Sequence, residues 1–183
     1  EVVKSVRSGT PHFFEHGLPK LLKDNLHNRF SVVDGFDAHG LCDVYFITVG
    51  TPIGRDGTPS MEYITSASKL IGRVLKKGDL VVFRSTVPIG TTRNVAIPIL
   101  EQMSKLRAGE DFLIAFAPER TIEGKALEEL RHLPQVVGGV NHASAELTSN
   151  IFSFMTKSTV MVDSLEEAEM VKTKYIKGEL SSE

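Results

Sequence analysis

Residues 112–139 read Phe-Leu-Ile-Ala-Phe-Ala-Pro-Glu-Arg-Thr-Ile-Glu-Gly-Lys-Ala-Leu-Glu-Glu-Leu-Arg-His-Leu-Pro-Gln-Val-Val-Gly-Gly, and they indicate how the chain is built. The apolar run 112–116 is typical of a strand buried on both faces of a parallel sheet. Pro118 ends this strand because it has no amide hydrogen for the ladder, and the charged residues Glu119 and Arg120 follow. Ligands of open α/β sheets bind beyond the carboxyl ends of the strands, so these side chains are predicted to line a site. From Pro-Glu-Arg alone, a solvated turn is the favoured interpretation.

The rest of the chain alternates predicted strands with predicted helices. Apolar and β-branched runs predict strands, and apolar stripes at helical spacing predict helices. Pro98 should kink one helix or shift its start, because proline lacks the amide hydrogen that a helix interior uses. The alternation predicts an α/β fold with a doubly wound, mostly parallel sheet. The strands are expected at 30–33, 43–49, 79–83, 112–116, 135–138 and 159–162, and the helices at 61–77, 92–105 and 144–156.

The composition is that of an ordinary globular protein with one good core. Of the 183 residues, 41% are hydrophobic and 24% are charged, and the formal net charge is -2. A charge this close to zero implies no nucleic acid as a partner. The sequence shows neither a run of about 20 apolar residues nor a signal peptide, so no membrane is expected as a partner.

The single cysteine, Cys42, excludes an intramolecular disulfide and fits a reducing compartment. We therefore expect a cytoplasmic protein. Cys42 stands at the start of a predicted strand, where a small core residue is expected, and no neighbour in the sequence activates it as a nucleophile. The chain starts without methionine in what reads as the middle of a helix, which indicates a fragment.

Hydroxyl residues follow two other predicted strands. Thr51 comes after the strand 43–49, where its hydroxyl and amide can donate to a phosphate or ribose oxygen, although a Thr-Pro turn is an equally good interpretation. Ser85 and Thr86 come after the strand 79–83. Thr86 can instead cap the following helix, and an amino terminus there would face a bound anion.

Three blocks in this order resemble the nucleotide-sugar 6-dehydrogenases, the family of UDP-glucose and UDP-N-acetylmannosamine dehydrogenases. They are Val-Gly-Thr-Pro at 49–52, Ser-Thr-Val-Pro-Ile-Gly-Thr-Thr at 85–92, and Pro-Glu-Arg-Thr-x-Glu-Gly-x-Ala-Leu-x-Glu-Leu with Leu-Pro-Gln-Val-Val-Gly-Gly within 118–139. The resemblance covers nearly the whole chain and, through Pro-Glu-Arg-Thr, is greatest to the UDP-N-acetylhexosamine branch. It implies a partial, Rossmann-like NAD-binding domain at 1–162, lacking its first βαβ portion, and the start of a central linking helix at 163–183.

The resemblance also implies a reaction. This is the NAD-dependent, two-step oxidation of the C6 alcohol of UDP-N-acetylmannosamine or UDP-N-acetylglucosamine to the uronic acid, for polysaccharide biosynthesis. A cysteine captures the aldehyde, and the resulting thioester is hydrolysed. The implied partners are the UDP-sugar and a second copy of the complete enzyme in a homodimer, and the resemblance implies no metal.

Site residues follow from the resemblance by position. Lys172, in the Ala-Glu-x-x-Lys pattern at 168–172, matches an active-site lysine that transfers a proton or stabilises an oxyanion. Glu119 would order or deprotonate the hydrolytic water, and Thr86 would help to hold it. Without the resemblance, Lys172 is interpreted as a solvated helix charge. For Glu123, a part in the acid–base network and a role as a helix-start carboxylate are equally good interpretations. The predicted cofactor contacts are Thr51, Ser85, Thr86 and Glu123, and the predicted substrate contacts are Arg120, Thr121 and Lys172.

Some features of the family are absent from these residues. The sequence contains no Gly-x-Gly-x-x-Gly turn and no match to the catalytic cysteine, and Ile176 stands where the family has asparagine. We therefore expect the 183 residues alone not to reduce NAD. Two alternatives remain open: a β-hydroxyacid-type dehydrogenase of similar architecture, and a non-catalytic truncated half-domain that binds a partner through an exposed sheet edge.

Overall fold

The computed structural model describes residues 1–34, 42–54 and 57–176, with the side chains of the last helix described up to residue 172. The chain divides into two compact units, residues 1–40 with 121–132 and residues 41–120 with 133–183. The second unit holds the sheet, and the first contains helices and loops. The last residues of the expected linking helix, 177–183, lie outside the described residues.

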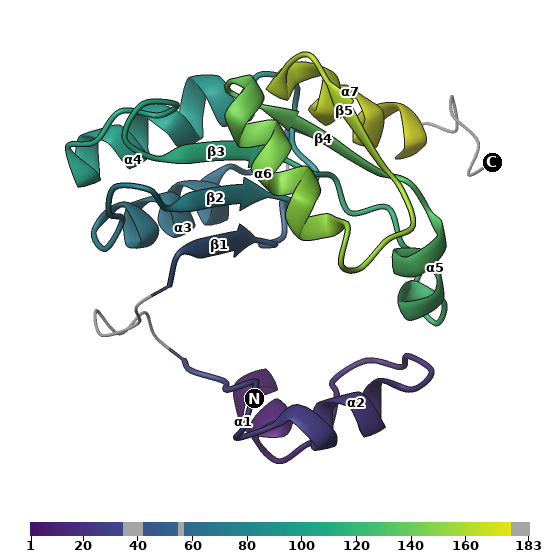
Figure 1. The fold of residues 1–183 in the computed structure, drawn as a ribbon. Coiled ribbons are helices and arrows are strands. Elements are labelled where there is room, and N and C mark those ends of the chain that lie inside the picture. The colour runs from purple at the N-terminus through teal and green to yellow at the C-terminus, as the bar shows by residue number, and fades with distance from the viewer. Residues whose placement is uncertain (35–41, 55–56, 177–183) are drawn as a thin grey trace. The chain divides into compact units, whose positions relative to one another are not determined.

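The second unit is built on a five-stranded sheet in the order β1-β2-β3-β4-β5 (Figure 1). Its first three strands are parallel, β4 is antiparallel to β3, and β5 is parallel to β4. The sheet is therefore mostly parallel, as predicted. The antiparallel pairing places the amino end of β4 at the same edge as the carboxyl end of β3. The strands are β1 (Val44–Ile47), β2 (Leu80–Phe83), β3 (Leu113–Phe116), β4 (Gln135–Gly139) and β5 (Thr159–Val162).

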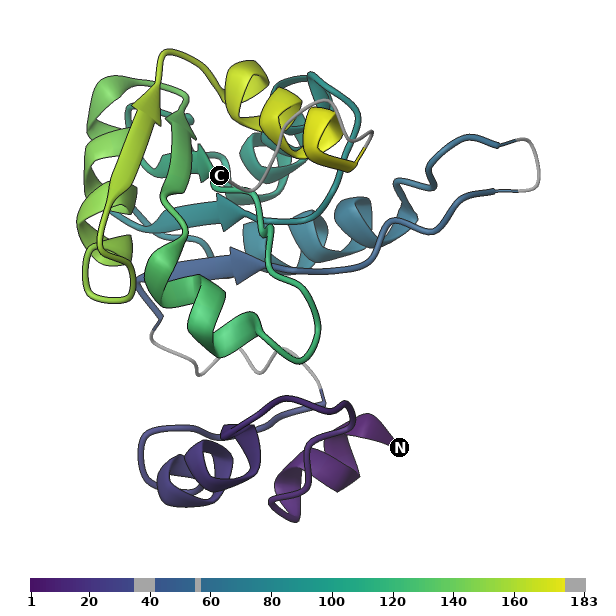
Figure 2. The same cartoon turned by 90° about the vertical axis from the view of Figure 1, so that its right-hand side faces the viewer.

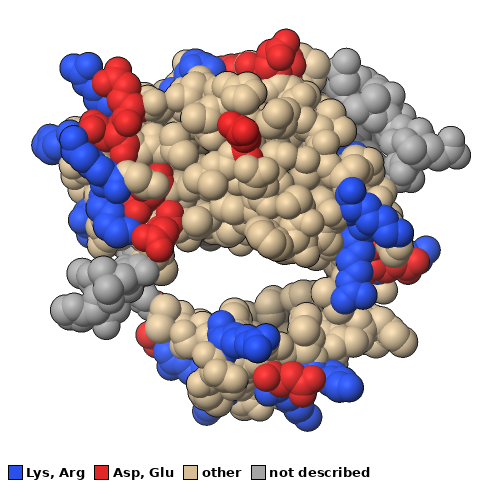
Figure 3. Space-filling model, in the orientation of Figure 1, with Lys and Arg blue, Asp and Glu red and all other residues tan. Residues whose placement is uncertain are grey.

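Helices cover both faces of the sheet (Figure 2). On one face the core includes Ile64 of α3, Leu100 of α4 and Leu165 of α7, and on the other face Phe152 of α6 packs against the strands. All four residues of β2 are buried, which explains its uninterrupted apolar sequence. The outer surface over α6 carries few charged side chains (Figure 3). The helices are α3 (Glu62–Gly72), α4 (Ile97–Ser104), α6 (His142–Phe152) and α7 (Leu165–Ile176).

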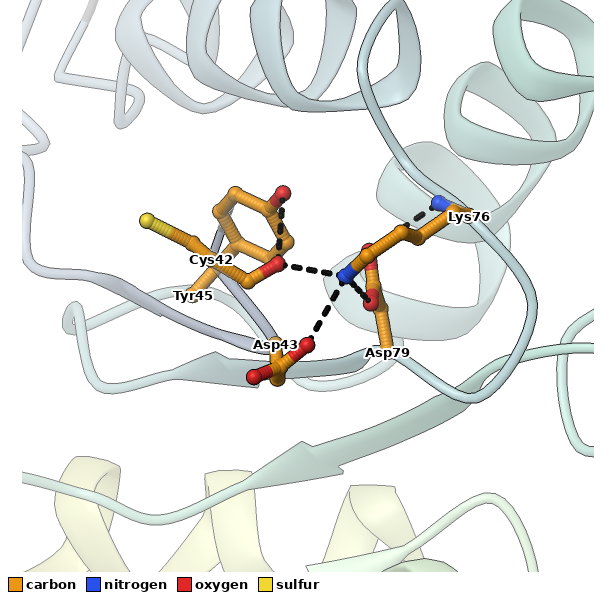
Figure 4. A network of polar contacts seen from close by, with 5 residues as sticks. All are labelled: Cys42, Asp43, Tyr45, Lys76 and Asp79. Carbon is orange, nitrogen blue, oxygen red and sulfur yellow. Dashed lines mark hydrogen bonds and ion pairs between the residues drawn. The ribbon is translucent and has the colours of Figure 1, made fainter. Parts of the chain in front are cut away.

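Two helices differ from the sequence prediction for local reasons. The helix α3 ends at Gly72 rather than near residue 77, because the buried carboxylate of Asp79 accepts the amide hydrogen of Lys76 at 3.0 Å (Figure 4). The predicted helix 92–105 is a π-helical turn, η1 (Thr92–Ala96), followed by α4. Pro98 stands in the first turn of α4, where its missing amide hydrogen has no intrahelical partner to lose.

Two expectations were wrong. Residues 30–33 form no strand, because Phe30 makes only an isolated bridge to Leu26 and no neighbouring strand is described in the first unit. Cys42 is exposed rather than part of the core. Its backbone carbonyl, not its thiol, makes the observed contacts, accepting from Lys76 at 2.8 Å and from Tyr45 at 3.2 Å (Figure 4).

The first unit contains α1 (Val2–Arg7), α2 (Leu18–Asn25) and α5 (Ala126–His132). Glu15 is buried and organises this unit, because its carboxylate accepts the backbone N–H groups of Gly124, Ala126 and Leu127 at 2.9, 3.1 and 3.3 Å. A carboxylate at this end of α5 is favoured by the helix dipole. Among the residues that the structure describes, none of the helices has the length and apolar character of a membrane span.

Candidate functional site

The parallel strands β1, β2 and β3 end at one edge of the sheet, and each is followed by a polar residue. Thr51 follows β1, Ser85 and Thr86 follow β2, and Glu119 follows β3. We call this the carboxyl edge. Binding sites of open α/β sheets lie at such edges because loops, rather than further strand residues, continue from them.

Two hydroxyl groups join the ends of β1 and β2. Thr51 Oγ1 donates to the carbonyl of Thr86 at 2.6 Å, and Ser85 Oγ donates to the carbonyl of Val49 at 2.6 Å. Both hydroxyl hydrogens are thus used within the protein, so that a ligand meets these two oxygens as acceptors. For Thr51, this geometry favours accepting a hydrogen from a ribose hydroxyl or an amide over donating its hydroxyl hydrogen to a phosphate or ribose oxygen, as the sequence suggested.

A buried arginine anchors Glu119. Arg84 directly follows β2, is 7% exposed, and forms an ion pair between its Nη2 and Oε2 of Glu119. Its Nη1 donates to Gln135 Oε1 at 3.2 Å, and its guanidinium carbon lies 4.7 Å from the centre of the Phe152 ring. Gln135 Nε2 in turn donates to the carbonyl of Pro118 at 3.1 Å. These partners compensate for the burial of the guanidinium charge, which would otherwise be costly.

Lys172, on α7, lies in the electrostatic field of the same cluster. Burial lowers the pKa of its ammonium group, nearby Arg84 and Arg120 lower it further, and Glu119 acts in the opposite direction. Lys172 thus lies within electrostatic range of Glu119, whereas Thr51 and Thr86 are in direct contact. A lysine whose pKa is lowered in this way exchanges a proton more readily near neutral pH than a surface lysine does.

The other predicted residues lie on the loop after β3. Arg120 donates through Nη2 to the carbonyl of Pro134 and is the last residue of this part of the second unit. Thr121 and Glu123 belong to the first unit, where the side chain of Glu123 is exposed. The carboxyl edge thus consists of residues of the second unit.

Sequence reasoning missed Arg84 and Gln135. Arg84 stands directly after the buried residues 80–83, and a charge in that position is a signal that could have found it. Gln135 is 51 residues away from Arg84 in the chain. Their contact depends on the antiparallel direction of β4, and no local pattern in the sequence encodes that direction.

The carboxyl edge combines acceptor oxygens with a lysine, a carboxylate and an arginine. Such a set can move a proton, orient a water molecule and stabilise negative charge on an oxygen. Within residues 1–34, 42–54 and 57–176, no group of three or more His, Cys, Asp and Glu side chains is arranged to hold a metal ion.

Comparison with known proteins relates this arrangement to a family. Residues 1–156 match the family model described as UDP-glucose/GDP-mannose dehydrogenase family, NAD binding domain. The chain belongs to the UDP-glucose/GDP-mannose dehydrogenase family. The resemblance seen in the three sequence blocks is thereby confirmed, as are the NAD-binding fold and NAD as its cofactor.

Members of the UDP-glucose/GDP-mannose dehydrogenase family with assigned substrates are similar to this chain. It is 34% identical over 173 residues to UDP-N-acetyl-D-mannosamine dehydrogenase of Pyrococcus horikoshii, covering 94% of this chain and 41% of that protein. It is 36% identical over 132 residues to UDP-N-acetyl-D-glucosamine 6-dehydrogenase of Pseudomonas aeruginosa, covering 72% and 31%. The solved structure of the Pyrococcus horikoshii enzyme matches with a TM-score of 0.91 at 31% identity, covering 97% of this chain and 42% of that one. The chain thus spans less than half the length of these relatives.

Proposed function

We propose that this chain is the NAD-binding part of a dehydrogenase that oxidises the C6 alcohol of a UDP-N-acetylhexosamine to the uronic acid, for polysaccharide biosynthesis. The observation that carries the proposal is the cluster of Lys172, Glu119 and Arg84 at the carboxyl edge of a sheet of this family. The complete enzyme acts as a homodimer, and its first βαβ portion and its nucleotide-sugar domain come from residues other than these.

Lys172 transfers a proton at the C6 oxygen of the sugar or holds negative charge on that oxygen. Its lowered pKa supports this role, because it raises the fraction of neutral amine that can accept a proton. Glu119 orders or deprotonates the water that hydrolyses the thioester, and Thr86 helps to hold that water. Arg84 keeps the carboxylate of Glu119 in one orientation through their ion pair.

The hydroxyl residues at the ends of β1 and β2 hold the cofactor. Thr51 and Ser85 offer acceptor oxygens, which fit the ribose hydroxyls or the carboxamide hydrogens of NAD. Thr86 and Glu123 are further proposed contacts. When bound, NAD supplies the hydride-accepting chemistry, and the protein supplies placement and charge.

Arg120, Thr121 and Lys172 contact the nucleotide sugar. The planar guanidinium group of Arg120 suits paired hydrogen bonds to oxygens of the substrate, in exchange for its contact with the Pro134 carbonyl. The Pro-Glu-Arg-Thr segment and the two relatives named above support UDP-N-acetylmannosamine or UDP-N-acetylglucosamine as the substrate.

The complete protein that carries these residues provides the test. Formation of NADH is followed with UDP-N-acetylmannosamine, UDP-N-acetylglucosamine, UDP-glucose and GDP-mannose as separate substrates. We expect turnover to be fastest with one of the two N-acetylhexosamines, with two hydrides passed to NAD for each uronic acid formed. Faster turnover of UDP-glucose or GDP-mannose would contradict the choice of sugar but not the reaction.

Two other results would contradict the reaction itself. Oxidation of small hydroxy acids without oxidation of any nucleotide sugar would favour a β-hydroxyacid-type dehydrogenase. No oxidation of any of these substrates, together with a stable complex with a second protein, would favour a non-catalytic half-domain.

A separate measurement tests the expectation that residues 1–183 alone do not reduce NAD. NAD reduction by these residues alone would show that the site needs no further residues.

A further inference from the structure

One buried glutamate on α7 has no role in the mechanism above. Glu169 is 0% exposed, and its carboxylate accepts the backbone N–H of Thr92 at 2.8 Å and also that of Gly90. These N–H groups lie where η1 begins, at the helix end that favours negative charge. Burial nevertheless raises the pKa of Glu169, because the buried carboxylate loses hydration. A carboxylate that is buried at such a cost in hydration calls for a physical reason.

The first turn of α7 is fixed on the sheet by close packing. A Cβ atom added to Gly138 in β4 would lie 2.1 Å from the carbonyl oxygen of Ser164 and 2.9 Å from Cβ of Ala168. Ser164 caps the helix, because its Oγ accepts the N–H of Glu167 at 3.2 Å. Close packing thus fixes the start of α7 on the sheet. About one turn further along, Glu169 fixes the helix through hydrogen bonds to the amides of Gly90 and Thr92.

Glu169 and Lys172 are three residues apart on α7 and therefore lie side by side on the helix surface. Glu169 binds the segment that follows β2, and Lys172 belongs to the cluster at the carboxyl edge. We propose that Glu169 is a positioning residue: by binding the amides of Gly90 and Thr92 it fixes the rotation of α7 and so places Lys172 at the carboxyl edge. This inference rests on the proposed role of Lys172.

A second, more exposed contact also joins α7 to η1, and it provides a control for the contact of Glu169. Arg93 of η1 pairs with Glu166 of α7, with 2.6 Å between Nε and Oε1, and their side chains are 44% and 30% exposed. Arg93 and Glu166 also interact electrostatically with Glu169. Both glutamates attach α7 to η1, but Glu169 alone is fully buried and lies next to Lys172.

The test compares Glu169→Gln with Glu166→Gln. Glutamine keeps the size of Glu169 but offers a single acceptor oxygen to two N–H groups, so the second half of the contact is lost. The pKa of Lys172 is measured by NMR after ¹³C-methylation of the lysines, with Lys172→Arg for assignment, and circular dichroism verifies folding. In the complete protein, kcat and the KM for NAD are measured with the preferred nucleotide sugar.

We expect Glu169→Gln to raise the pKa of Lys172 toward the ordinary value of about 10.4, because a loosened α7 leaves the amine more hydrated. We expect kcat to fall on the order of tenfold or more, because small misplacements of a reacting group are costly, while the KM for NAD changes by less than about twofold. Glu166→Gln should leave both the pKa of Lys172 and kcat unchanged.

Wild-type values of the Lys172 pKa and kcat in Glu169→Gln would overturn the proposal, and so would equal changes in Glu166→Gln. If Glu169→Gln does not fold, Glu169→Asp is measured instead. We then expect a pKa of Lys172 between its wild-type value and its ordinary value, and a wild-type pKa of Lys172 would contradict the role of Glu169. If the complete protein oxidises no nucleotide sugar, the proposed function fails, but the pKa comparison still tests the placement of Lys172.

Discussion

Two lysines lie at opposite edges of the same sheet, and the pKa values of their ammonium groups are shifted in opposite directions. At the amino edge, where β1 and β2 begin, Lys76 Nζ donates to the carbonyl of Cys42 at 2.8 Å, to Asp43 at 3.0 Å and to Asp79 (Figure 4). The hydrogen bond with Asp79, and next that with Asp43, raises the pKa of Lys76 above its ordinary value. At the carboxyl edge, burial lowers the pKa of Lys172.

The difference shows how the surroundings of a lysine decide its use. The amino edge carries side chains of both charges close together, at the left of Figure 3, and Lys76 is satisfied by carboxylates on two sides. Lys172 has Arg84 and Arg120 near it, with Glu119 opposing them. An ammonium group paired with carboxylates stabilises the fold and keeps its proton. An ammonium group that is buried near other cations loses its proton more easily. We therefore propose that the amino edge has a structural role and that the proposed chemistry takes place at the carboxyl edge.

The largest expected effect comes from removing each lysine in turn. Lys172→Met in the complete protein should lower kcat by about 10² to 10⁴-fold, the contribution that a positioned proton-transfer group typically makes. Lys76→Met is the matched control at the amino edge, and it should lower the melting temperature and leave kcat unchanged. Steady-state NADH formation and thermal melts measure both properties. Equal losses of kcat in the two variants would remove the distinction between the edges.

Arg84→Met should have the next largest effect, on stability. The variant removes the ion pair between Arg84 and Glu119 and the hydrogen bond from Arg84 to Gln135. We expect the free energy of unfolding to fall by about 2 kcal/mol, less than for a fully buried pair because the Glu119 side chain is 36% exposed. The pKa of Lys172 should rise, because a neighbouring cation is removed. Urea unfolding and the NMR titration of Lys172 provide the two measurements.

A double variant tests whether the loss comes from the ion pair. Arg84→Met combined with Glu119→Gln removes both charges, so part of the lost stability should return. If the double variant is no more stable than Arg84→Met, the packing of the arginine against Phe152, and not the pair with Glu119, accounts for the loss.

Much of the fold could be predicted because its signals are local. The runs 80–83 and 113–116 are buried strands whose apolar sequence is visible without coordinates, and Pro118 marks where β3 has ended. The antiparallel direction of β4 could not be predicted, because it depends on how the chain returns to the sheet after α5. The early end of α3 at Gly72 was also hidden, since it depends on a side chain, Asp79, that lies beyond the helix.

The residues of the candidate site also differ in whether local sequence signals could reveal them. Thr51, Thr86 and Glu119 could be placed at one edge because each comes within three residues of the end of a predicted strand, and carboxyl ends of parallel strands share an edge. The lowered pKa of Lys172 depends on tertiary burial, which the sequence of a helix does not reveal. Arg84 was overlooked because its partner Glu119 follows another strand, 35 residues later in the chain.

A smaller effect is expected from Asp79→Asn at the amino edge. The side chain of Asp79 is 2% exposed and accepts from both the amide and the ammonium of Lys76. Asparagine keeps the shape but loses the charge, so the free energy of unfolding should fall by about 1–2 kcal/mol. The pKa of Lys76 should fall toward its ordinary value while that of Lys172 stays unchanged. An unaltered pKa for Lys76 would show that Asp43, not Asp79, dominates its surroundings.

The smallest expected effect is the pH dependence of stability, which should have opposite signs at the two edges. The folded-state pKa of Lys172 lies below its unfolded value of about 10.4, so between these values the unfolded state binds more protons and stability rises with pH. The folded-state pKa of Lys76 lies above the unfolded value, so its contribution is fully present below about pH 10.4 and is lost as pH rises through the folded pKa.

The two Lys→Met variants make these signs measurable by urea unfolding from neutral to alkaline pH. At neutral pH, Lys172→Met should be more stable than wild type, by at most about 1 kcal/mol because solvent screens a half-buried amine, and the gain should shrink as pH rises. Lys76→Met should be less stable than wild type at neutral pH, and its deficit should shrink only at strongly alkaline pH. If Lys172→Met were instead destabilised at neutral pH, its ammonium would be as well matched as that of Lys76, and the two edges could not be assigned different roles on electrostatic grounds.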